Sequence, residues 1–357
     1  MLNQNHQNPS TGITKQQIIA HAASQAQKLM QTQPIAPNMG MITLQTGNNW
    51  MQQAEGEPDA LMLFGEFWHQ GELCILFADT NLGKSILAVQ IGDSISRGEP
   101  IYPLRLQAGE QQVIYLDFEL TKKQFQHRYK NAENEQYQWS PLFLRGEIDP
   151  EKIFPDGKYT FEDYLNLSLE KAVEESGTRI LIIDNLTYLR NETEKAKDAL
   201  PLMKHLKNLK NQYGLSILAL AHTPKRDGTR PITHNDLQGS KMLMNFCDSA
   251  FAIGKSQKDT SLRYLKQIKQ RNTEEIYGSD RICLFNITKP GLFLKFDFVD
   301  YGREWEHLRD QSDEEREQLK TQITELLQQG KSVRETAAML QISRSKVERI
   351  SKAAKNG

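Results

Sequence analysis

The stretch Leu76-Phe-Ala-Asp-Thr-Asn-Leu-Gly-Lys-Ser85 joins an apolar run to an amphipathic run and places Gly-Lys-Ser at the junction. An apolar strand predicted from Leu73 to Phe77 ends here in a tight turn, and a helix predicted from Lys84 to Arg97 follows and is closed by Gly98. Such a turn directs backbone N–H groups and the positive end of the helix at an anion. The pattern therefore predicts a phosphate-binding loop, and the alternative is a polar turn that binds nothing.

The residue types of this loop suit the binding of a polyphosphate. The Lys84 amine can reach the β and γ phosphates, and the Ser85 hydroxyl is a ligand for Mg²⁺. The usual first glycine of the motif G-x-x-x-x-G-K-[ST] is Ala78 here, so the turn must tolerate a Cβ atom at that position. The candidate nucleotide-binding residues are Ala78, Asp79, Thr80, Asn81, Leu82, Gly83, Lys84, Ser85 and Ile86.

Composition and charge limit the class of protein. A chain of 357 residues with 38% hydrophobic residues can form one large globular domain with appendages. The formal net charge is -1, so nucleic-acid binding would depend on local basic patches. The three cysteines are far apart in apolar contexts, which predicts buried free thiols in a reducing cytosol. No apolar run approaches ~20 residues and no signal peptide is recognisable, so we expect a cytoplasmic protein without a membrane span.

The chain divides into four segments by pattern. Residues 1–56 are rich in Gln and Asn and predict a flexible arm with one short helix near Thr14 to Met30. Residues 57–300 alternate apolar strands with helical segments, which predicts an α/β fold with a mostly parallel sheet flanked by helices. Residues 301–318 are dense in charge and predict a linker, and residues 319–357 predict a small all-α module.

The strands expected in the central sheet are short apolar runs bounded by polar turns. They are Leu73 to Phe77, Val113 to Phe118, Arg179 to Ile183, Ser216 to Ala221, Ser249 to Ile253 and Tyr264 to Gln270. Two further strands, Ile282 to Thr288 and Leu292 to Phe298, flank Lys289-Pro-Gly291 and predict a closing hairpin.

Two acidic side chains end buried strands downstream of the loop. Asp184 follows a wholly apolar strand, so we expect it to hold the Mg²⁺ shell with Ser85, directly or through water; the alternative is an ordinary core strand with a helix-capping Asp. Glu119 ends the strand before the capping box Thr121-Lys-Lys-Gln124. Ligands of open α/β sheets bind at this edge, so Glu119 is the candidate that polarises the attacking water, and Asp117 is the competing choice.

Three further polar residues lie near the ends of later strands. His222 is at the tip of the fourth strand, where it is either a γ-phosphate sensor or a core histidine. Lys269 and Arg271 are two residues apart on one strand face, which is either solvated or presents two cations to the γ-phosphate of a neighbouring subunit. An arginine finger of this kind contributes on the order of 10³ or more in rate.

In this order the parts resemble the RecA/DnaB-type hexameric ATPases, and most closely the RepA-type plasmid replication helicases, AAA ATPases of mobile elements. The resemblance covers roughly residues 57–300. It implies a ring that translocates on single-stranded DNA at the expense of ATP, with nucleotide sites between subunits. It also implies that Gln238-Gly-Ser240 leaves a central DNA-facing loop. Basic residues of this loop would contact phosphates without reading the sequence, and they are Lys225, Arg226 and Arg230.

The C-terminal segment carries a second DNA-binding pattern. A capping box, Ser332-Val-Arg-Glu335, opens one short helix, and Ser343 caps another. The apolar residues spaced as a helix-turn-helix core are Ala337, Leu340, Ile342, Val347 and Ile350. The basic residues of the second helix, placed as in a recognition helix, are Arg344, Lys346, Arg349 and Lys352. The segment resembles the modules of resolvases and invertases, with Gln341 at the turn where glycine is usual, and the alternative is a helical hairpin for partner contacts.

These features together predict a homohexameric ATPase that uses ATP and Mg²⁺ and acts on DNA in the replication of a plasmid or mobile element. Its catalytic residues would be Lys84, Glu119, His222, Lys269 and Arg271, and its metal ligands Ser85 and Asp184. Single-stranded DNA would pass through the ring, and duplex DNA would contact the C-terminal helices. Two alternatives are an ATP-controlled, sequence-specific DNA-binding regulator and a recombinase-like filament protein.

Overall fold

The structure, a computed structural model, describes Gln16, Ile19 and residues 42–149, 160–189, 199–224, 226–237, 240–309, 313–340 and 342–355. It divides into two units, residues 1–59 and 60–357, and each is described by itself. In the first unit, helix α2 (Gly47–Ala54) begins where the Thr46 hydroxyl accepts a hydrogen bond from the Asn49 backbone N–H at 3.3 Å. The sequence did not predict this helix, and most of the helix expected near Thr14 to Met30 lies outside the described residues.

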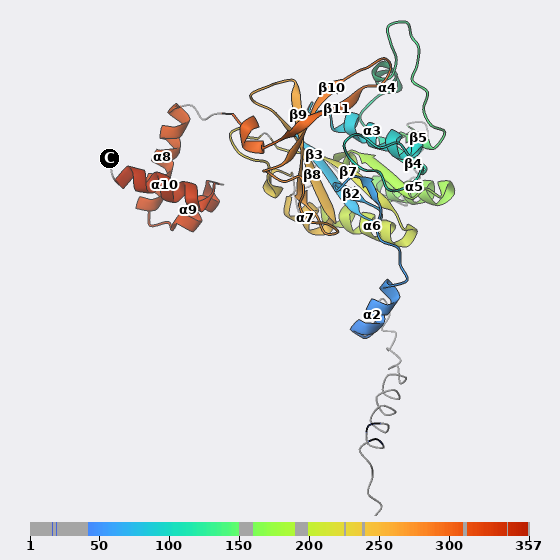
Figure 1. Ribbon diagram of the computed structural model, residues 1–357, viewed down its shortest axis with the longest axis horizontal. Helices are drawn as coiled ribbons and strands as arrows, with labels where there is room; N and C mark the ends of the chain where they lie inside the picture. Colours follow the sequence, from blue (N-terminus) through green and yellow to red (C-terminus); the bar gives the residue numbers. More distant parts are fainter. Residues whose placement is uncertain are drawn as a thin grey trace, which may run out of the picture. The chain divides into compact units, whose positions relative to one another are not determined.

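The second unit is built on a nine-stranded sheet in the order β11-β10-β9-β8-β3-β7-β6-β4-β5 (Figure 1). The strands are β3 (Leu73–Ala78), β4 (Val113–Asp117), β5 (Phe143–Gly146), β6 (Ile180–Asp184), β7 (Ser216–His222), β8 (Ser249–Lys255), β9 (Leu262–Lys269), β10 (Ile282–Thr288) and β11 (Lys295–Gly302). Those from β8 to β5 run parallel, and β9, β10 and β11 continue the sheet antiparallel. A smaller sheet pairs β1 (Met62–Phe64) with β2 (Trp68–His69).

Helices cover both faces of the large sheet. They are α3 (Lys84–Arg97), α4 (Lys122–Arg128), α5 (Phe161–Ser176), α6 (Ala199–Tyr213) and α7 (Ser240–Phe246), with short 3-10 turns η1 (Leu186–Leu189), η3 (His234–Asp236) and η4 (Glu304–His307). Figure 1 shows α3 and α6 on opposite sides of the sheet. Strand β3 is buried on both faces, because its alternate side chains enter two separate hydrophobic cores. The predicted α/β class, a mostly parallel sheet flanked by helices, is confirmed.

The predicted strands all occur, with ends that differ by a few residues. The expected hairpin is present as β10 and β11, which pair from Ile282 with Gly302 to Thr288 with Lys295. Strand β5 was not predicted, because an edge strand of four residues, Phe-Leu-Arg-Gly, buries only its first side chain and shows no apolar run. Strand β5 carries Arg145, which forms an ion pair with Asp117 of β4.

The segment predicted as a charged linker differs from that expectation. Strand β11 runs to Gly302, past the expected boundary at residue 300. Glu304 is fully buried, accepts a hydrogen bond from the Ile232 N–H at 2.6 Å and forms an ion pair with Lys266. One of the charged residues in 301–307, Glu304, is therefore not part of a solvated linker, because it forms a buried ion pair with Lys266 of β9. Helix α8 (Asp313–Gln328) then begins inside the same segment.

Helices α8, α9 (Val333–Met339) and α10 (Arg344–Lys355) form a small all-α module. Its buried core consists of Leu319, Ile323, Ala337 and Val347, with Leu340, Ile342 and Ile350 packed against it. The predicted capping box is present, since the Ser332 hydroxyl accepts from the Glu335 N–H at 3.2 Å. Gln341, at the expected turn, lies outside the described residues.

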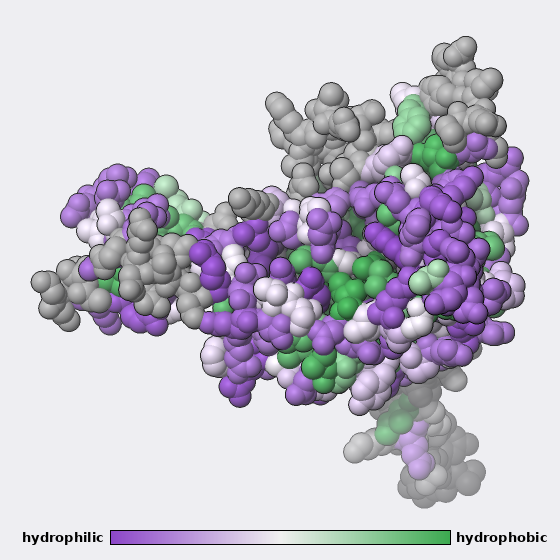
Figure 2. Space-filling model, turned by 90° about the horizontal axis from the view of Figure 1, so that it is seen from above, coloured by the Kyte–Doolittle hydropathy of each residue, from purple (hydrophilic) through white to green (hydrophobic). Residues whose placement is uncertain are grey.

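Surface polarity and the cysteines agree with a globular chain. Figure 2 shows one face of the molecule, on which hydrophobic surface is surrounded by hydrophilic residues. All three cysteines are buried free thiols, as predicted. Among the helices of the described ranges, none is long and apolar enough to cross a membrane.

Candidate active site

The phosphate-binding loop follows β3, and its geometry explains Ala78. Ala78 is the last residue of β3 and pairs with His222 on one side and Ile253 on the other. A residue in a strand has an extended backbone that accepts a Cβ atom, and the Ala78 methyl group is buried in the core. Positive φ angles occur instead at Asn81 (63°) and Gly83 (95°). Asparagine is among the residues that tolerate this conformation, so the loop needs glycine only at residue 83.

We expect Ala78→Gly to retain ATP binding and Gly83→Ala to lose it. The first removes one buried methyl group and should cost about 1 kcal/mol while leaving ATP binding intact. The second forces alanine to a φ of 95° and places a Cβ atom 2.8 Å from Ile287 Cδ1. We expect it to lower the free energy of unfolding by about 2 kcal/mol or more and to abolish ATP binding. Denaturant unfolding and binding of a fluorescent ATP analogue measure both; equal ATP affinities of the two variants would contradict this account of the loop.

The Lys84 ammonium is buried at the centre of the loop. Its Nζ donates to the carbonyl oxygens of Ala78 at 3.0 Å and Asp79 at 3.2 Å and lies 3.2 Å from Nδ1 of His222. Burial lowers the pKa of Lys84, while the charges of Asp184, Glu119 and Asp79 oppose that shift. The two carbonyl oxygens and the nearby carboxylates favour the charged form of Lys84, which is the form that binds phosphate.

Asp184 lies at the end of β6, deep in the sheet edge. Its carboxylate is 1% exposed, accepts a hydrogen bond from the Tyr115 hydroxyl at 2.8 Å and is hydrogen-bonded to Ser85. The pKa of Asp184 is raised to about 6: burial is the largest cause, the charges of Glu119 and Asp117 act in the same direction, and the hydrogen bonds with Ser85 and Tyr115 oppose the shift. Because burial and neighbouring carboxylates disfavour the charged form of Asp184, a bound cation would stabilise that form.

The donor set at this point fits Mg²⁺. Ser85 and Asp184 bring a hydroxyl and a carboxylate oxygen together at the start of α3. Within the described ranges, no group of three or more His, Cys, Asp or Glu side chains could hold a metal ion. Magnesium commonly binds through one or two protein oxygens and completes its shell with waters and substrate phosphates. These two residues would therefore hold it only together with a nucleotide.

Glu119, and not Asp117, points its carboxylate at the loop. Glu119 Oε1 accepts a hydrogen bond from Asn185 Nδ2 and lies 3.4 Å from Nε2 of His222. Its bond to His222 is the main cause that lowers the pKa of Glu119, and the charge of Lys84 acts in the same direction. The Asp117 side chain is fully buried in an ion pair with Arg145 at 3.0 Å. Of the two acids, Glu119 therefore lies beside the loop and Asp117 does not, and its role as the base stays a prediction.

His222 connects the lysine with the glutamate. Because an ammonium group only donates hydrogen bonds, Nδ1 of His222 must accept the bond from Lys84 at 3.2 Å. Nε2 of His222 lies 3.4 Å from Oε1 of Glu119. His222, the residue predicted to be a γ-phosphate sensor, therefore lies between Lys84 and Glu119 and contacts both.

Sequence reasoning missed three residues of the site. Asn185 follows Asp184 directly through a cis peptide bond and contacts both Glu119 and Nε2 of His222, the latter at 3.0 Å. Tyr115, inside β4, binds Asp184. Arg128, at the end of α4, helps to lower the pKa of Glu119, and its buried Nη1 has no hydrogen-bond acceptor in the part of the chain that the structure describes. Asn185 could have been found as a polar residue at a strand tip.

Lys269 and Arg271 lie at the opposite edge of the sheet. Strand β9 runs antiparallel to β8, so Lys269 pairs with Ala250 near the start of β8. Its ammonium donates to the Cys247 carbonyl oxygen at 2.7 Å, and Arg271 Nη1 donates to Asp248 Oδ1 at 3.2 Å. The fold therefore does not bring these two cations to the loop of their own chain. A role in hydrolysis requires a second chain.

The basic residues after β7 are paired with acids of the same loop. Arg226 Nε lies 3.2 Å from Asp236 Oδ1, and Arg230 Nε lies 3.3 Å from Asp227 Oδ2. Lys225, Gln238 and Gly239 lie outside the described residues. These pairs reduce the positive charge that the loop presents.

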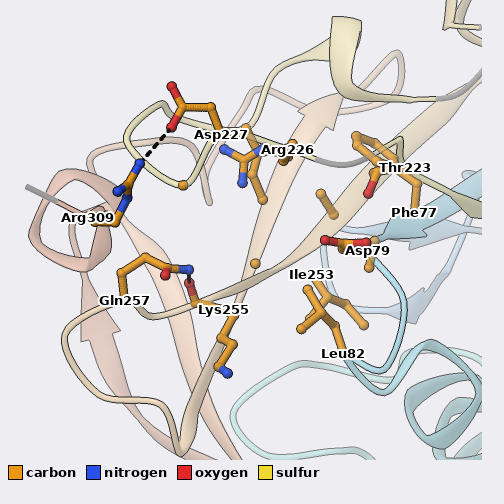
Figure 3. A pocket seen from close by; sticks show the side chains of 15 residues that line it. Phe77, Asp79, Leu82, Thr223, Arg226, Asp227, Ile253, Lys255, Gln257 and Arg309 are labelled. Atoms are coloured by element: carbon orange, nitrogen blue, oxygen red, sulfur yellow. Dashed lines mark hydrogen bonds and ion pairs between the residues drawn. The ribbon is translucent and has the colours of Figure 1, made fainter. Parts of the chain in front are cut away.

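A cavity of about 350 Å³ lies between this loop and the phosphate-binding loop. Figure 3 shows Thr223 and Asp79 on one side of it and Arg226, Asp227 and Arg309 on the other, where Arg309 pairs with Asp227. Residues far apart in sequence thus meet beside the phosphate-binding loop.

On α10 the basic side chains are partly accessible. Arg344, Arg349 and Lys352 are exposed and Lys346 is half-buried. Ser343 caps the helix as predicted, because its hydroxyl accepts from the Lys346 N–H at 3.2 Å. The module therefore offers several cations on one helix, as the sequence analysis expected.

A strand, a loop with Lys84 and Ser85, and acidic residues at the tips of two nearby strands define a P-loop ATPase. A family model described as an AAA domain matches residues 43–228, and the chain belongs to this family. Among solved structures, the chain is similar to a KaiC-like protein from the hyperthermophilic archaeon Pyrococcus horikoshii OT3. The two are 14% identical, over 64% of this chain and 90% of that chain, with a TM-score of 0.45. Comparison with curated proteins gave no match.

Proposed function

We propose that the protein is a Mg²⁺-dependent ATPase that translocates on DNA and unwinds it during replication of a plasmid or mobile element. One observation carries the proposal: His222, which bridges Lys84 and Glu119, is the last residue of β7, and β7 continues into the basic loop. The nucleotide site is thereby joined directly to a loop that carries Arg226 and Arg230.

Each group of the site has a defined task in hydrolysis. Lys84 and the loop N–H groups bind the β and γ phosphates, and Glu119 accepts a proton from the water that attacks the γ phosphorus. Ser85 and Asp184 would hold Mg²⁺, which would supply positive charge to the phosphate oxygens. A phosphate that draws the Lys84 ammonium away from His222 frees Nδ1, so the histidine reports whether the γ-phosphate is present.

The loop after β7 is attached at both ends to the ATPase core. At its start the Thr223 N–H donates to the Ala78 carbonyl oxygen at 3.1 Å. Further along, the Ile232 carbonyl oxygen accepts from Lys266 Nζ at 2.7 Å, and Glu304 binds the Ile232 N–H. Movement of this loop on DNA is thus transmitted to Ala78 and His222, which supports coupling of DNA binding to hydrolysis.

The remaining part of the proposal is that several copies of the chain assemble. Arg271 is 49% exposed at the sheet edge opposite the nucleotide site, where it pairs with Asp248, and it would exchange this ion pair for the γ-phosphate of an adjacent copy. A closed homohexameric ring places every site at such a boundary. The basic face of α10 is then the contact for duplex DNA.

We expect single-stranded DNA to raise the ATPase rate several-fold and the protein to unwind a forked duplex only with ATP. Lys84→Ala should abolish both activities, because the phosphate-binding cation is lost. Lys171→Ala, which removes an exposed lysine of α5, is the matched control and should leave both unchanged. Phosphate release and strand displacement measure these outcomes.

The same experiments separate the rivals. Sequence-specific duplex binding without unwinding would identify a regulator. Open filaments in negative-stain images, in place of rings, would identify a recombinase-like protein. Absence of stimulation by single-stranded DNA would exclude a DNA motor and leave only an ATPase.

A further inference from the structure

The turn that carries Glu119 is held by two side chains from the two outermost parallel strands, the buried Asp117 of β4 and the partly exposed Arg145 of β5. Asp117 Oδ1 accepts hydrogen bonds from the backbone N–H groups of Glu119 at 3.1 Å and Leu120 at 2.9 Å. Arg145 of β5 completes the arrangement, because its Nη2 donates to the Leu120 carbonyl oxygen at 2.7 Å. Both backbone polar groups of Leu120 are thus bound by this pair.

The two side chains are themselves firmly placed. Two guanidinium nitrogens of Arg145, Nε and Nη2, share one carboxylate oxygen, Asp117 Oδ2, at 3.1 and 3.0 Å. Asp117 is fully buried, and the guanidinium of Arg145 stacks over the Phe125 ring at 4.9 Å. Charge-assisted bonds in a buried setting resist bending, so the pair is a rigid support.

A second strand fixes the turn from the other side. The Phe118 N–H donates to the Asp184 carbonyl oxygen at 2.9 Å, so the backbone before Glu119 is tied to the strand of the metal-associated acid. The hydrogen bond of Phe118 joins two backbone groups, whereas the bonds made by Asp117 and Arg145 depend on side chains. The position of the Glu119 carboxylate beside His222 therefore depends on Arg145, which touches neither the phosphate-binding loop nor His222 in any contact of the described structure.

We propose that Asp117 and Arg145 are positioning residues for hydrolysis, and that they hold Glu119 where it can accept the proton of the attacking water. This inference rests on the proposed role of Glu119 as the base. Asp117, which was the alternative candidate for the base, then positions Glu119 and does not itself accept the proton. Small errors in the placement of a base reduce the rate strongly while the binding of substrate is preserved.

The test uses the full-length protein with three changes of Arg145 and one control. Arg145→Gln should lower kcat about 10- to 100-fold and change the Kd of a fluorescent ATP analogue less than about threefold. Arg145→Lys keeps one cation for Asp117 but cannot also reach Leu120, so an intermediate kcat is expected. Guanidinium ion at millimolar concentration should restore part of the rate of Arg145→Ala.

Glu147→Gln is the matched control. Glu147 accepts from Arg145 Nη1 at 2.9 Å and binds no atom of the Glu119 turn in the described structure. It removes an ion pair of the same arginine without touching the support, so kcat should stay within about twofold.

The outcomes separate this inference from the proposed function. An unchanged kcat in Arg145→Gln, or a loss of ATP binding in proportion to kcat, overturns the positioning role. If Arg145→Gln fails to fold, the kcat and Kd of Arg145→Lys decide by the same criterion. If Glu119→Gln itself retains hydrolysis, the proposed base is wrong and this inference falls with it, whereas loss in Glu119→Gln with full activity in Arg145→Gln overturns the inference alone.

Discussion

Replacing Glu119 by glutamine should leave ATP binding intact and lower the rate of hydrolysis by at least about 10²-fold. The glutamine amide has the same shape and can still accept the hydrogen bond from Asn185, but it cannot take a proton from water. Lys84, Ser85 and the loop backbone are unchanged, so the nucleotide should bind as before. Titration with a fluorescent ATP analogue and single-turnover phosphate release measure the two quantities.

The competing acid provides the contrast. Asp117→Asn keeps an oxygen for the N–H groups of Glu119 and Leu120 but loses the ion pair with Arg145, so it should reduce the rate less than Glu119→Gln does. Abolished hydrolysis in Asp117→Asn together with an active Glu119→Gln would show that the base is Asp117.

Asp184→Asn should abolish Mg²⁺-dependent hydrolysis and, without metal, increase the stability of the protein. The pKa of Asp184 is raised by burial to about 6, so at pH 7 the folded protein carries a carboxylate that burial disfavours. Removing that charge should raise the free energy of unfolding by on the order of 2 kcal/mol, because the Asn oxygen still accepts the bond from Tyr115. Denaturant unfolding in EDTA and ATPase assays with Mg²⁺ test the two effects.

The pH dependence gives this prediction a definite sign. The ordinary pKa of an aspartate is about 4, so between about pH 4 and 6 the folded protein binds a proton that the unfolded chain releases. The stability difference between Asp184→Asn and the unchanged protein should therefore be full above about pH 6 and shrink as the pH falls towards 4. Asp297→Asn, at an exposed aspartate, should stay within about 0.5 kcal/mol at every pH. A difference that grows with falling pH would contradict the assignment of the raised pKa.

Much of the fold could be predicted from the sequence because its strands are apolar runs that end in polar residues. Such a pattern is local, and β3, β6 and β7 show it clearly. Strand β5 lacks it, because a short edge strand is half exposed. The buried ion pair of Glu304 with Lys266 could not be predicted either, because the sequence does not indicate which distant residue a charged side chain will pair with.

The candidate site was predictable to the extent that parallel strands bring their carboxyl ends to one edge. Asp184, Glu119 and His222 could be gathered there from their places in sequence alone. Asn185 and Arg128 were missed, because one polar residue beside a strand tip and one arginine in a helix are common features. Only the contacts with Glu119 distinguish them.

The sequence by itself determined the phosphate-binding loop, the order of the apolar strands along the chain, and the edge of the sheet where the acids meet. Tertiary structure decided which acid lies beside the phosphate-binding loop, because Arg145 comes from β5 and pairs with Asp117 only when β5 lies beside β4. It also decided that Ala78 is harmless, since the first motif position lies in a strand, and that Arg271 faces away from its own loop, since β9 runs antiparallel. Local patterns depend on neighbours along the chain, whereas these contacts depend on strand order and register, which join residues far apart in sequence.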